Sequence, residues 1–341
     1  MTTAREYHLR AYPEGAPTAD IFQLVERELP DPAEGEVEVE VTHLSVDPYM
    51  RGRMRPGVES YIPPFQLNEA LDGGAVGRVV KSRSGSLKEG DRVVANSGGL
   101  GWRDRAVVAA KGLTPLPDLP VPDSAYLGVL GMPGLTAWAG LTQIIAPRDG
   151  DVLYVSGAAG AVGSLVCQLG LQRGLTVLGS AGSQAKRDWL EGEIGIAKAF
   201  DYRAYDARSL SSAIREIAPG GVNGYFENVG GMQLEALIDA MAGRGRIAAC
   251  GMIADYNATT PPPGPRNMVM VVGKQLRIEG FIVTRFESLR AEFFAEVAPL
   301  VAAGKVVMRE TVFSGLESAP EAFMGLFKGA NTGKAVVEVR V

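Results

Sequence analysis

Hydrophobic and polar residues alternate along the first third of the chain with the period of β-strands. Residues 36–42 read Glu-Val-Glu-Val-Glu-Val-Thr, so every second side chain would face a core. Shorter apolar runs at 74–80 and 91–95, bounded by glycine and charged residues, predict two further strands. The proline-rich segment 113–122 interrupts this pattern and indicates a domain boundary, and residues 125–145 are predicted to be helical.

From residue 151 the pattern changes to strands that alternate with helices. The predicted strands are residues 152–156, 176–179, 198–201, 222–227 and 246–251. The predicted helices are residues 161–173, 184–192, 208–217 and 233–242. This alternation is typical of βαβ units with a parallel sheet, whose ligands bind at the carboxyl ends of the strands.

The last part of the chain predicts a return to the first domain. Residues 275–283 are apolar and strand-like, and residues 288–303 are a helix candidate, whereas the three consecutive prolines in 257–265 exclude regular structure. The tail 334–341 alternates like the N-terminal part. We therefore predict an α/β fold with a β-rich domain over 1–125, a doubly wound parallel-sheet domain over 126–300, and a return segment over 301–341 that completes the first domain.

The segment 155–164, Val-Ser-Gly-Ala-Ala-Gly-Ala-Val-Gly-Ser, carries the strongest functional signal. Gly157, Gly160 and Gly163 lie between a predicted strand and a predicted helix. Without side chains at these positions, backbone N–H groups can approach a ligand closely, and the start of the helix offers unpaired donors. The segment predicts a pyrophosphate site, and the alternative is a glycine-rich turn that only packs the helix closely on the strand.

The residues that follow favour NADP over NAD. No Asp or Glu occurs between Asp151 and Asp188, where an NAD site would place its ribose-binding carboxylate. Ser180, Ser183 and the pair Lys186-Arg187 occupy this window instead, and such side chains suit a 2′-phosphate. The alternative interpretation of the two cations is an ordinary solvated helix face.

Composition excludes several other classes. The net charge of −5 argues against a general nucleic-acid or membrane-surface role, and no apolar run reaches the length of a membrane span. The two His and two Cys form no CxxC or HExxH spacing, so no metal site is expected. The chain contains no GxSxG motif, which argues against a serine hydrolase. The N-terminus lacks an apolar signal core, so we expect a cytoplasmic protein.

The chain resembles the medium-chain dehydrogenase/reductase superfamily, and within it the zinc-independent branch of prostaglandin reductases, leukotriene hydroxydehydrogenases, alkenal double-bond reductases and curcumin reductases. The similar segments run along nearly the whole chain. They are residues 45–51, 61–65, 131–137, 155–164, 181–183, 225–231, 250–251, 256–257, 280–283 and 331–334. The resemblance implies a GroES-like catalytic domain, a Rossmann NADP-binding domain and a homodimer.

The resemblance also implies roles for single residues. Ser180, Gly182, Lys186 and Tyr202 would surround the 2′-phosphate, and Asn228 would contact a ribose. The other residues that it implies for the cofactor are Gly160, Ala161, Val162 and Gly163 at the pyrophosphate, and Thr136, Cys250, Tyr256, Phe281, Val283 and Asn331 elsewhere on the cofactor. Two positions depart from the family pattern, because Ala254-Asp255 precedes Tyr256 where many relatives have a Ser, and Glu227 replaces an Asp.

The expected reaction is NADPH-dependent reduction of the carbon–carbon double bond of a small, apolar α,β-unsaturated carbonyl compound. Negative charge develops on the carbonyl oxygen, and a neutral phenol is a suitable donor to it. Tyr256 is the first candidate and Tyr49 the second, although either ring could instead only pack. Two other functions stay open, a quinone reductase of the same superfamily and a non-catalytic NADPH-binding protein.

Overall fold

The computed structural model describes residues 2–96 and 99–339 and separates into two compact units. The first unit comprises residues 1–131 and 309–341, and the second comprises residues 132–308. The sequence prediction placed these boundaries at 126 and 301. The predicted return of the tail is confirmed, because β15 (Lys334–Glu338) pairs antiparallel with β3 (Glu36–Ser45). Residues 340 and 341 of the predicted tail strand lie outside the described residues.

Strands are the main regular elements of the first unit. Its larger sheet has the order β14-β15-β3-β4-β5-β7, with β6 paired to β3, and β1 and β2 form a separate hairpin. The further strands are β1 (Thr2–Leu9), β2 (Phe22–Leu29), β4 (Ala75–Ser82), β5 (Arg92–Ala95), β6 (Arg105–Ala109), β7 (Thr114–Pro115) and β14 (Glu310–Ser314). One α-helix, α8 (Ala319–Leu326), precedes β15 among the described residues of this unit.

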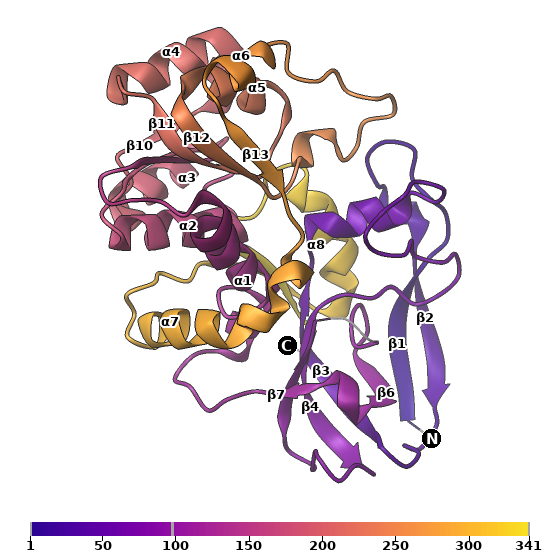
Figure 1. Cartoon of the computed structure of the whole chain (residues 1–341). Coiled ribbons are helices and arrows are strands. Elements are labelled where there is room, and N and C mark those ends of the chain that lie inside the picture. The colour runs from indigo at the N-terminus through magenta and orange to yellow at the C-terminus, as the bar shows by residue number, and fades with distance from the viewer. Residues whose placement is uncertain (1, 97–98, 340–341) are drawn as a thin grey trace. The chain divides into compact units, whose positions relative to one another are not determined.

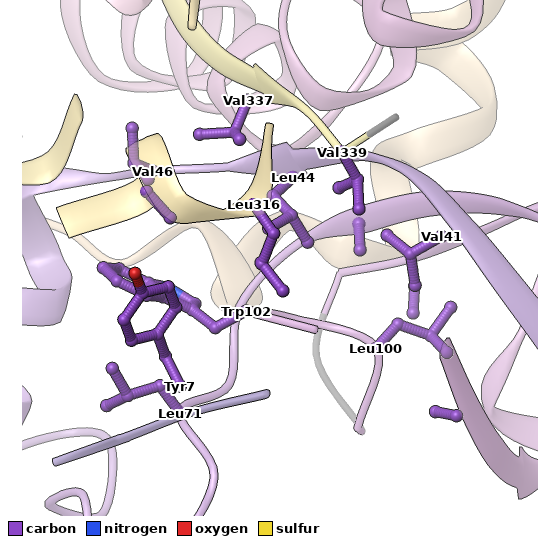
Figure 2. Close-up of a cluster of buried hydrophobic side chains, with 14 of the residues drawn as sticks. Tyr7, Val41, Leu44, Val46, Leu71, Leu100, Trp102, Leu316, Val337 and Val339 are labelled. Carbon is purple, nitrogen blue, oxygen red and sulfur yellow. The ribbon is translucent and has the colours of Figure 1, made fainter. Parts of the chain in front are cut away.

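The core of the first unit joins residues from both ends of the chain. Val37, Val39 and Val41 of β3 are fully buried, as their alternation predicts. Figure 2 shows how this core combines side chains of β1, β3 and β15 around Trp102. The expectation that β3 is half-buried is wrong at Glu38, which is completely buried and forms an ion pair of 2.8 Å with Arg105 on β6.

The second unit contains a six-stranded parallel sheet in the order β10-β9-β8-β11-β12-β13. Numbered within the unit, this is 3-2-1-4-5-6, the order of a Rossmann sheet with its switch point between β8 and β11. The strands are β8 (Val152–Val155), β9 (Thr176–Ser180), β10 (Lys198–Phe200), β11 (Val222–Glu227), β12 (Met241–Ala249) and β13 (Arg277–Gly280). The five strands predicted between 152 and 251 are therefore confirmed, with shifts at their ends.

Helices cover both faces of this sheet, with α4, α5 and α6 on one side and α1 and α2 on the other (Figure 1). Their bounds are α1 (Met132–Ala139), α2 (Ala161–Gln172), α3 (Gln184–Trp189), α4 (Ala207–Ile217), α5 (Gly231–Ala240), α6 (Val269–Gly273) and α7 (Arg290–Ala302). The helical stretch predicted over 125–145 is confirmed except at residues 128–131. A tight turn at Gly131, where a Cβ would lie 2.2 Å from the Tyr126 carbonyl oxygen, separates α1 from the preceding 3₁₀ turn.

Candidate functional site

The glycine-rich turn joins β8 to α2 at the switch point of the sheet. Gly157 has φ +59°, and Gly160 is the N-cap residue of α2. A Cβ on Gly163 would lie only 2.5 Å from the Gly157 carbonyl oxygen, so a side chain there would open the turn. The N–H groups of Ala161, Val162 and Gly163 have no carbonyl partner within their own helix, and they carry the positive end of its dipole. The turn therefore has the shape and polarity of a phosphate cradle.

A second polar cluster lies beside Gly182, just after β9. A Cβ on Gly182 would lie 3.0 Å from the Tyr202 hydroxyl and 3.1 Å from the Arg203 guanidinium, whose Nη1 donates to the Gly182 carbonyl at 2.9 Å. Partial burial, and then the charge of Arg203, lower the pKa of Lys186. A phenol and a guanidinium thus lie beside a bare backbone position, with the Lys186 ammonium close enough to the guanidinium to feel its charge, and an anion would relieve the repulsion between the two cations.

Two polar residues near this cluster point elsewhere. The Ser180 hydroxyl is completely buried and donates to Gln233 Oε1 at 2.6 Å, so the phosphate contact predicted for it does not follow from this geometry. Arg187 forms an ion pair of 2.9 Å with Asp201, so its guanidinium is already bound by a carboxylate of the protein. Lys186 is therefore the cation of the predicted pair that belongs to the cluster.

The Glu227 side chain joins the carboxyl ends of two adjacent strands, β8 and β11. Its buried carboxylate accepts from Ser156 Oγ at 2.7 Å and from the N–H of Gly230 at 3.0 Å, and it also accepts from the Tyr225 hydroxyl. Burial raises the pKa of Glu227. Asn228, the next residue, donates through Nδ2 to the Ser156 carbonyl at 2.7 Å. These bonds hold the predicted ribose-binding residue against the end of β8.

A pocket of about 600 Å³ opens where β12 and β13 end, a size usual for a small-molecule site. It is lined by Ala249, Cys250, Gly251, Met252, Gly280, Phe281, Ile282 and Arg285. Phe281 packs edge-on against Phe226, with ring centroids 6.2 Å apart. The pocket includes the predicted residues Cys250 and Phe281, whereas Val283 is not among its lining residues.

Tyr256 lies beside this pocket. Its hydroxyl accepts from the Met252 N–H at 3.4 Å, and a Cβ on Gly251 would lie 3.1 Å from the same oxygen. Burial raises the pKa of Tyr256, so its phenol is protonated at neutral pH. Burial, followed by the charge of Glu227, raises the pKa of Cys250 to about 12, which keeps this thiol protonated as well. The pocket is thus bordered by a neutral proton donor.

Three other predicted residues are held by local contacts. Thr136 is buried in α1 and donates its hydroxyl to the Met132 carbonyl at 2.8 Å. In the first unit, Asn331 Nδ2 donates to the Gly333 carbonyl at 2.8 Å. Tyr49 belongs to the 3₁₀ helix η2 (Pro48–Met54), and burial together with the charge of Asp47 raises its pKa.

Among the described residues, no group of three or more His, Cys, Asp or Glu side chains is arranged to hold a metal ion. Within the same part of the chain, no helix has both the length and the apolar character needed to cross a membrane.

Comparison with known proteins assigns the family. Residues 5–116 match a model described as the N-terminal domain of oxidoreductase, and residues 161–303 match one described as zinc-binding dehydrogenase. The chain is 40% identical over 342 residues to the putative NADP-dependent oxidoreductase YfmJ of Bacillus subtilis, with 99% of both chains covered. It belongs to the medium-chain dehydrogenase/reductase superfamily, in the zinc-independent branch.

Two further relatives place the chain within this branch. The NADP⁺-dependent 2-alkenal reductase of Nicotiana tabacum is 42% identical over 305 residues, which cover 89% of this chain and 87% of that protein. The crystal structure of CurA in complex with NADPH from Vibrio vulnificus is 37% identical, covers 99% of both chains and has a TM-score of 0.92. The branch is one of NADP-dependent oxidoreductases.

The structure adds residues to this site that the sequence reasoning missed. Arg203 lies beside Lys186 because β9 and β10 are neighbours, and the short run after β10 could have been searched for cations. Ile282 and Arg285 line the pocket through the turn after β13, which the sequence reasoning treated as the end of a strand. Glu227 was noted as a motif residue but was given no role.

Proposed function

We propose that this chain uses NADPH to reduce the carbon–carbon double bond of α,β-unsaturated ketones and aldehydes. The observation that carries the proposal is the pocket at the ends of β12 and β13, which has Phe281 and Ile282 in its wall and the protonated phenol of Tyr256 beside it. An apolar wall with one positioned donor suits a small enone. The 2-alkenal reductase relative supports this substrate class.

The residues present fit NADPH. The turn at Gly157, Gly160 and Gly163 would hold the pyrophosphate. It can close tightly only because Gly163 has no Cβ, and its backbone N–H groups then face the ligand. The cluster of Lys186, Tyr202 and Arg203 around Gly182 would hold the 2′-phosphate. Asn228 would hold a ribose from the end of β11. NADPH, when bound, supplies the hydride for the β-carbon of the substrate.

The tyrosines would act on the carbonyl oxygen of the substrate. Negative charge grows on that oxygen as the double bond is reduced, and a donor already in place stabilises it without reorganisation. Tyr256 has the raised pKa of a group that stays protonated and can donate a hydrogen bond or a proton. Tyr49 is the second candidate, with its pKa also raised. The phenols, and no metal ion, would polarise the carbonyl.

The test is NADPH oxidation with an alkenal, an aryl enone and a quinone, using the wild-type chain and Tyr256→Phe. We expect both enones to be reduced to saturated carbonyl compounds. Loss of the hydroxyl should lower kcat about 100-fold while the KM for NADPH stays nearly unchanged, in line with the usual contribution of one proton donor. Tyr205→Phe is the matched control, because Tyr205 packs on Phe200 in the same unit.

The other outcomes are distinct. Fast quinone turnover with inert enones would instead establish a quinone reductase, and clear NADPH binding without turnover would favour a binding protein. Unchanged kcat in Tyr256→Phe would remove the role of this phenol while leaving the substrate class intact. Cytoplasmic location stays a prediction that fractionation of the source cells would test.

We also propose that the chain forms a homodimer through β13. This strand is the last of its sheet, and Val269 and Val272 of α6 and Ile278 of β13 are exposed. Antiparallel pairing of two copies centred on Ile278 would place Arg277 opposite Glu279, so the edge is complementary to itself in charge. Analytical ultracentrifugation should give twice the chain mass, and Ile278→Lys should halve it; a monomeric wild-type chain would refute the proposal.

A further inference from the structure

A buried ion pair joins the tail of the chain to the segment that carries Tyr49. Lys334 and Asp47 have side chains that are 4% and 9% exposed, and Lys334 Nζ lies 3.3 Å from Asp47 Oδ1. The same nitrogen donates to the Val46 carbonyl at 2.9 Å and to the Ala335 carbonyl at 2.8 Å. An ammonium has three N–H groups, and these three acceptors account for all of them.

The pair continues the register of the sheet beyond its last hydrogen-bonded residues. Val336 of β15 lies opposite Ser45 of β3, so Lys334 and Asp47 are each two residues further on in the same antiparallel register. The Ser45 hydroxyl donates to Asp47 Oδ2, which gives the second carboxylate oxygen its own partner. The ammonium and the carboxylate therefore each have one partner on their own segment and at least one on the other.

Each member of the pair lies near a predicted site residue. Asp47 directly precedes η2, its carbonyl accepts from the Met50 N–H at 3.1 Å, and Tyr49 lies in that turn. On the other segment, Asn331 bonds to the Gly333 carbonyl, and Gly333 is packed so tightly that a Cβ would lie 1.8 Å from the Arg309 carbonyl oxygen. Lys334 follows directly and fixes the end of this segment.

We infer that Lys334 and Asp47 are positioning residues, whose ion pair holds the Tyr49 turn and the Asn331 segment in one geometry. The inference rests on the proposed function for the role of Tyr49, and on the cofactor contact predicted for Asn331. A buried pair adds little net stability, because desolvation of both charges offsets their attraction. Its effect here is on geometry, since it ties two segments that are far apart in the sequence to a single contact.

The first readout needs neither cofactor nor substrate. Hydrogen exchange of the ligand-free chain should show faster exchange at 47–54 and at 331–335 together in Lys334→Met, and again in Asp47→Asn. Faster exchange confined to the segment that carries the substitution would overturn the inference. Because this readout is independent of turnover, it decides the coupling even if the chain does not reduce enones.

The second readout is kinetic. Lys334→Met should lower kcat for an enone about tenfold or more and weaken NADPH binding measured by fluorescence, because a displaced donor loses its alignment. The double variant with Asp47→Asn should be no worse than Lys334→Met alone, since both remove one contact. If Lys334→Met does not fold, Asp47→Asn, which keeps the side-chain shape, gives the same comparison.

The control is Arg105→Met, which removes an ion pair with the buried Glu38 elsewhere in the same unit. It should lower the Tm but leave kcat and the KM for NADPH within about twofold of the wild type. If Lys334→Met behaves like this control, with a lower Tm and unchanged kinetic constants, the pair is only structural and the inference is wrong.

Discussion

At the scale of single residues, we propose that the charges beside Gly182 select the dinucleotide. The guanidinium of Arg203 is close enough to lower the pKa of Lys186, so the two cations repel each other in the ligand-free chain. A 2′-phosphate would relieve this repulsion and accept hydrogen bonds from both side chains and from Tyr202. A bare 2′-hydroxyl would offer no such compensation, so under the proposed function the cluster would discriminate between NADPH and NADH.

Removal of either cation should therefore weaken binding of NADPH more than binding of NADH. Lys186→Ala and Arg203→Ala should each raise the KM for NADPH about tenfold or more, because a hydrogen bond to a charged group contributes about 1.5–3 kcal/mol. The KM for NADH should change little. Arg208→Ala, on the exposed face of α4, is the matched control. If either variant raised the KM for NADPH and the KM for NADH by the same factor, the cluster would not contact the 2′-phosphate.

Sequence identifies residue types at such a site better than it identifies their partners. Lys186 and Tyr202 were both predicted to contact the 2′-phosphate; in the structure the Tyr202 hydroxyl and the Arg203 guanidinium lie beside Gly182, and the charge of Arg203 acts on Lys186. The Ser180 hydroxyl was predicted to face the same ligand, but it bonds to Gln233 on α5, which is far away in the sequence. The orientation of a short side chain depends on such distant partners, and the local pattern carries no information about them.

At the scale of elements, the turn between β8 and α2 depends on its packing density. Gly157 and Gly163 approach so closely that even a methyl group on Gly163 would contact the Gly157 carbonyl oxygen and the Ala158 Cα, at 2.5 and 2.9 Å. This closeness aligns the first N–H groups of α2 at the turn. The same close packing thus sets both the shape of the turn and the direction of its N–H donors.

Gly163→Ala should therefore weaken NADPH binding and lower stability together. We expect a Kd for NADPH raised about tenfold or more and a loss of about 1–3 kcal/mol, the usual cost of an overpacked site. Nicotinamide fluorescence and thermal unfolding measure the two effects. Gly192→Ala is the control, since a Cβ there meets no atom within 4 Å. Unchanged NADPH affinity in Gly163→Ala would contradict a role for this turn.

The elements that were predicted correctly are those with a continuous pattern. The strands from β8 to β12 are apolar runs separated by helices, and a parallel sheet requires such runs because both of its faces are covered. β1 and β2 were missed because they form a separate two-stranded sheet, and β2 is mostly exposed. Their side chains are a mixture of charged and apolar residues without clear alternation, so tertiary packing decides their structure.

At the scale of the whole molecule, the chain combines a discontinuous β-rich unit with a Rossmann unit. The tail was predicted to return because 334–341 alternates like the first strands, and β15 pairs with β3 as expected. The parallel partner of β15, β14, was not predicted. A connection that contains α8 separates β14 from β15 along the chain. Their pairing is therefore not visible in the local sequence pattern.

The proposed reaction transfers a hydride from NADPH to the β-carbon of an enone. The most direct test is one turnover with NADPH that carries deuterium at the transferred position, followed by mass spectrometry and NMR of the product. We predict a saturated carbonyl compound with a single deuterium at the β-carbon and a solvent proton at the α-carbon. Deuterium at the carbonyl carbon, with the double bond intact, would contradict the account.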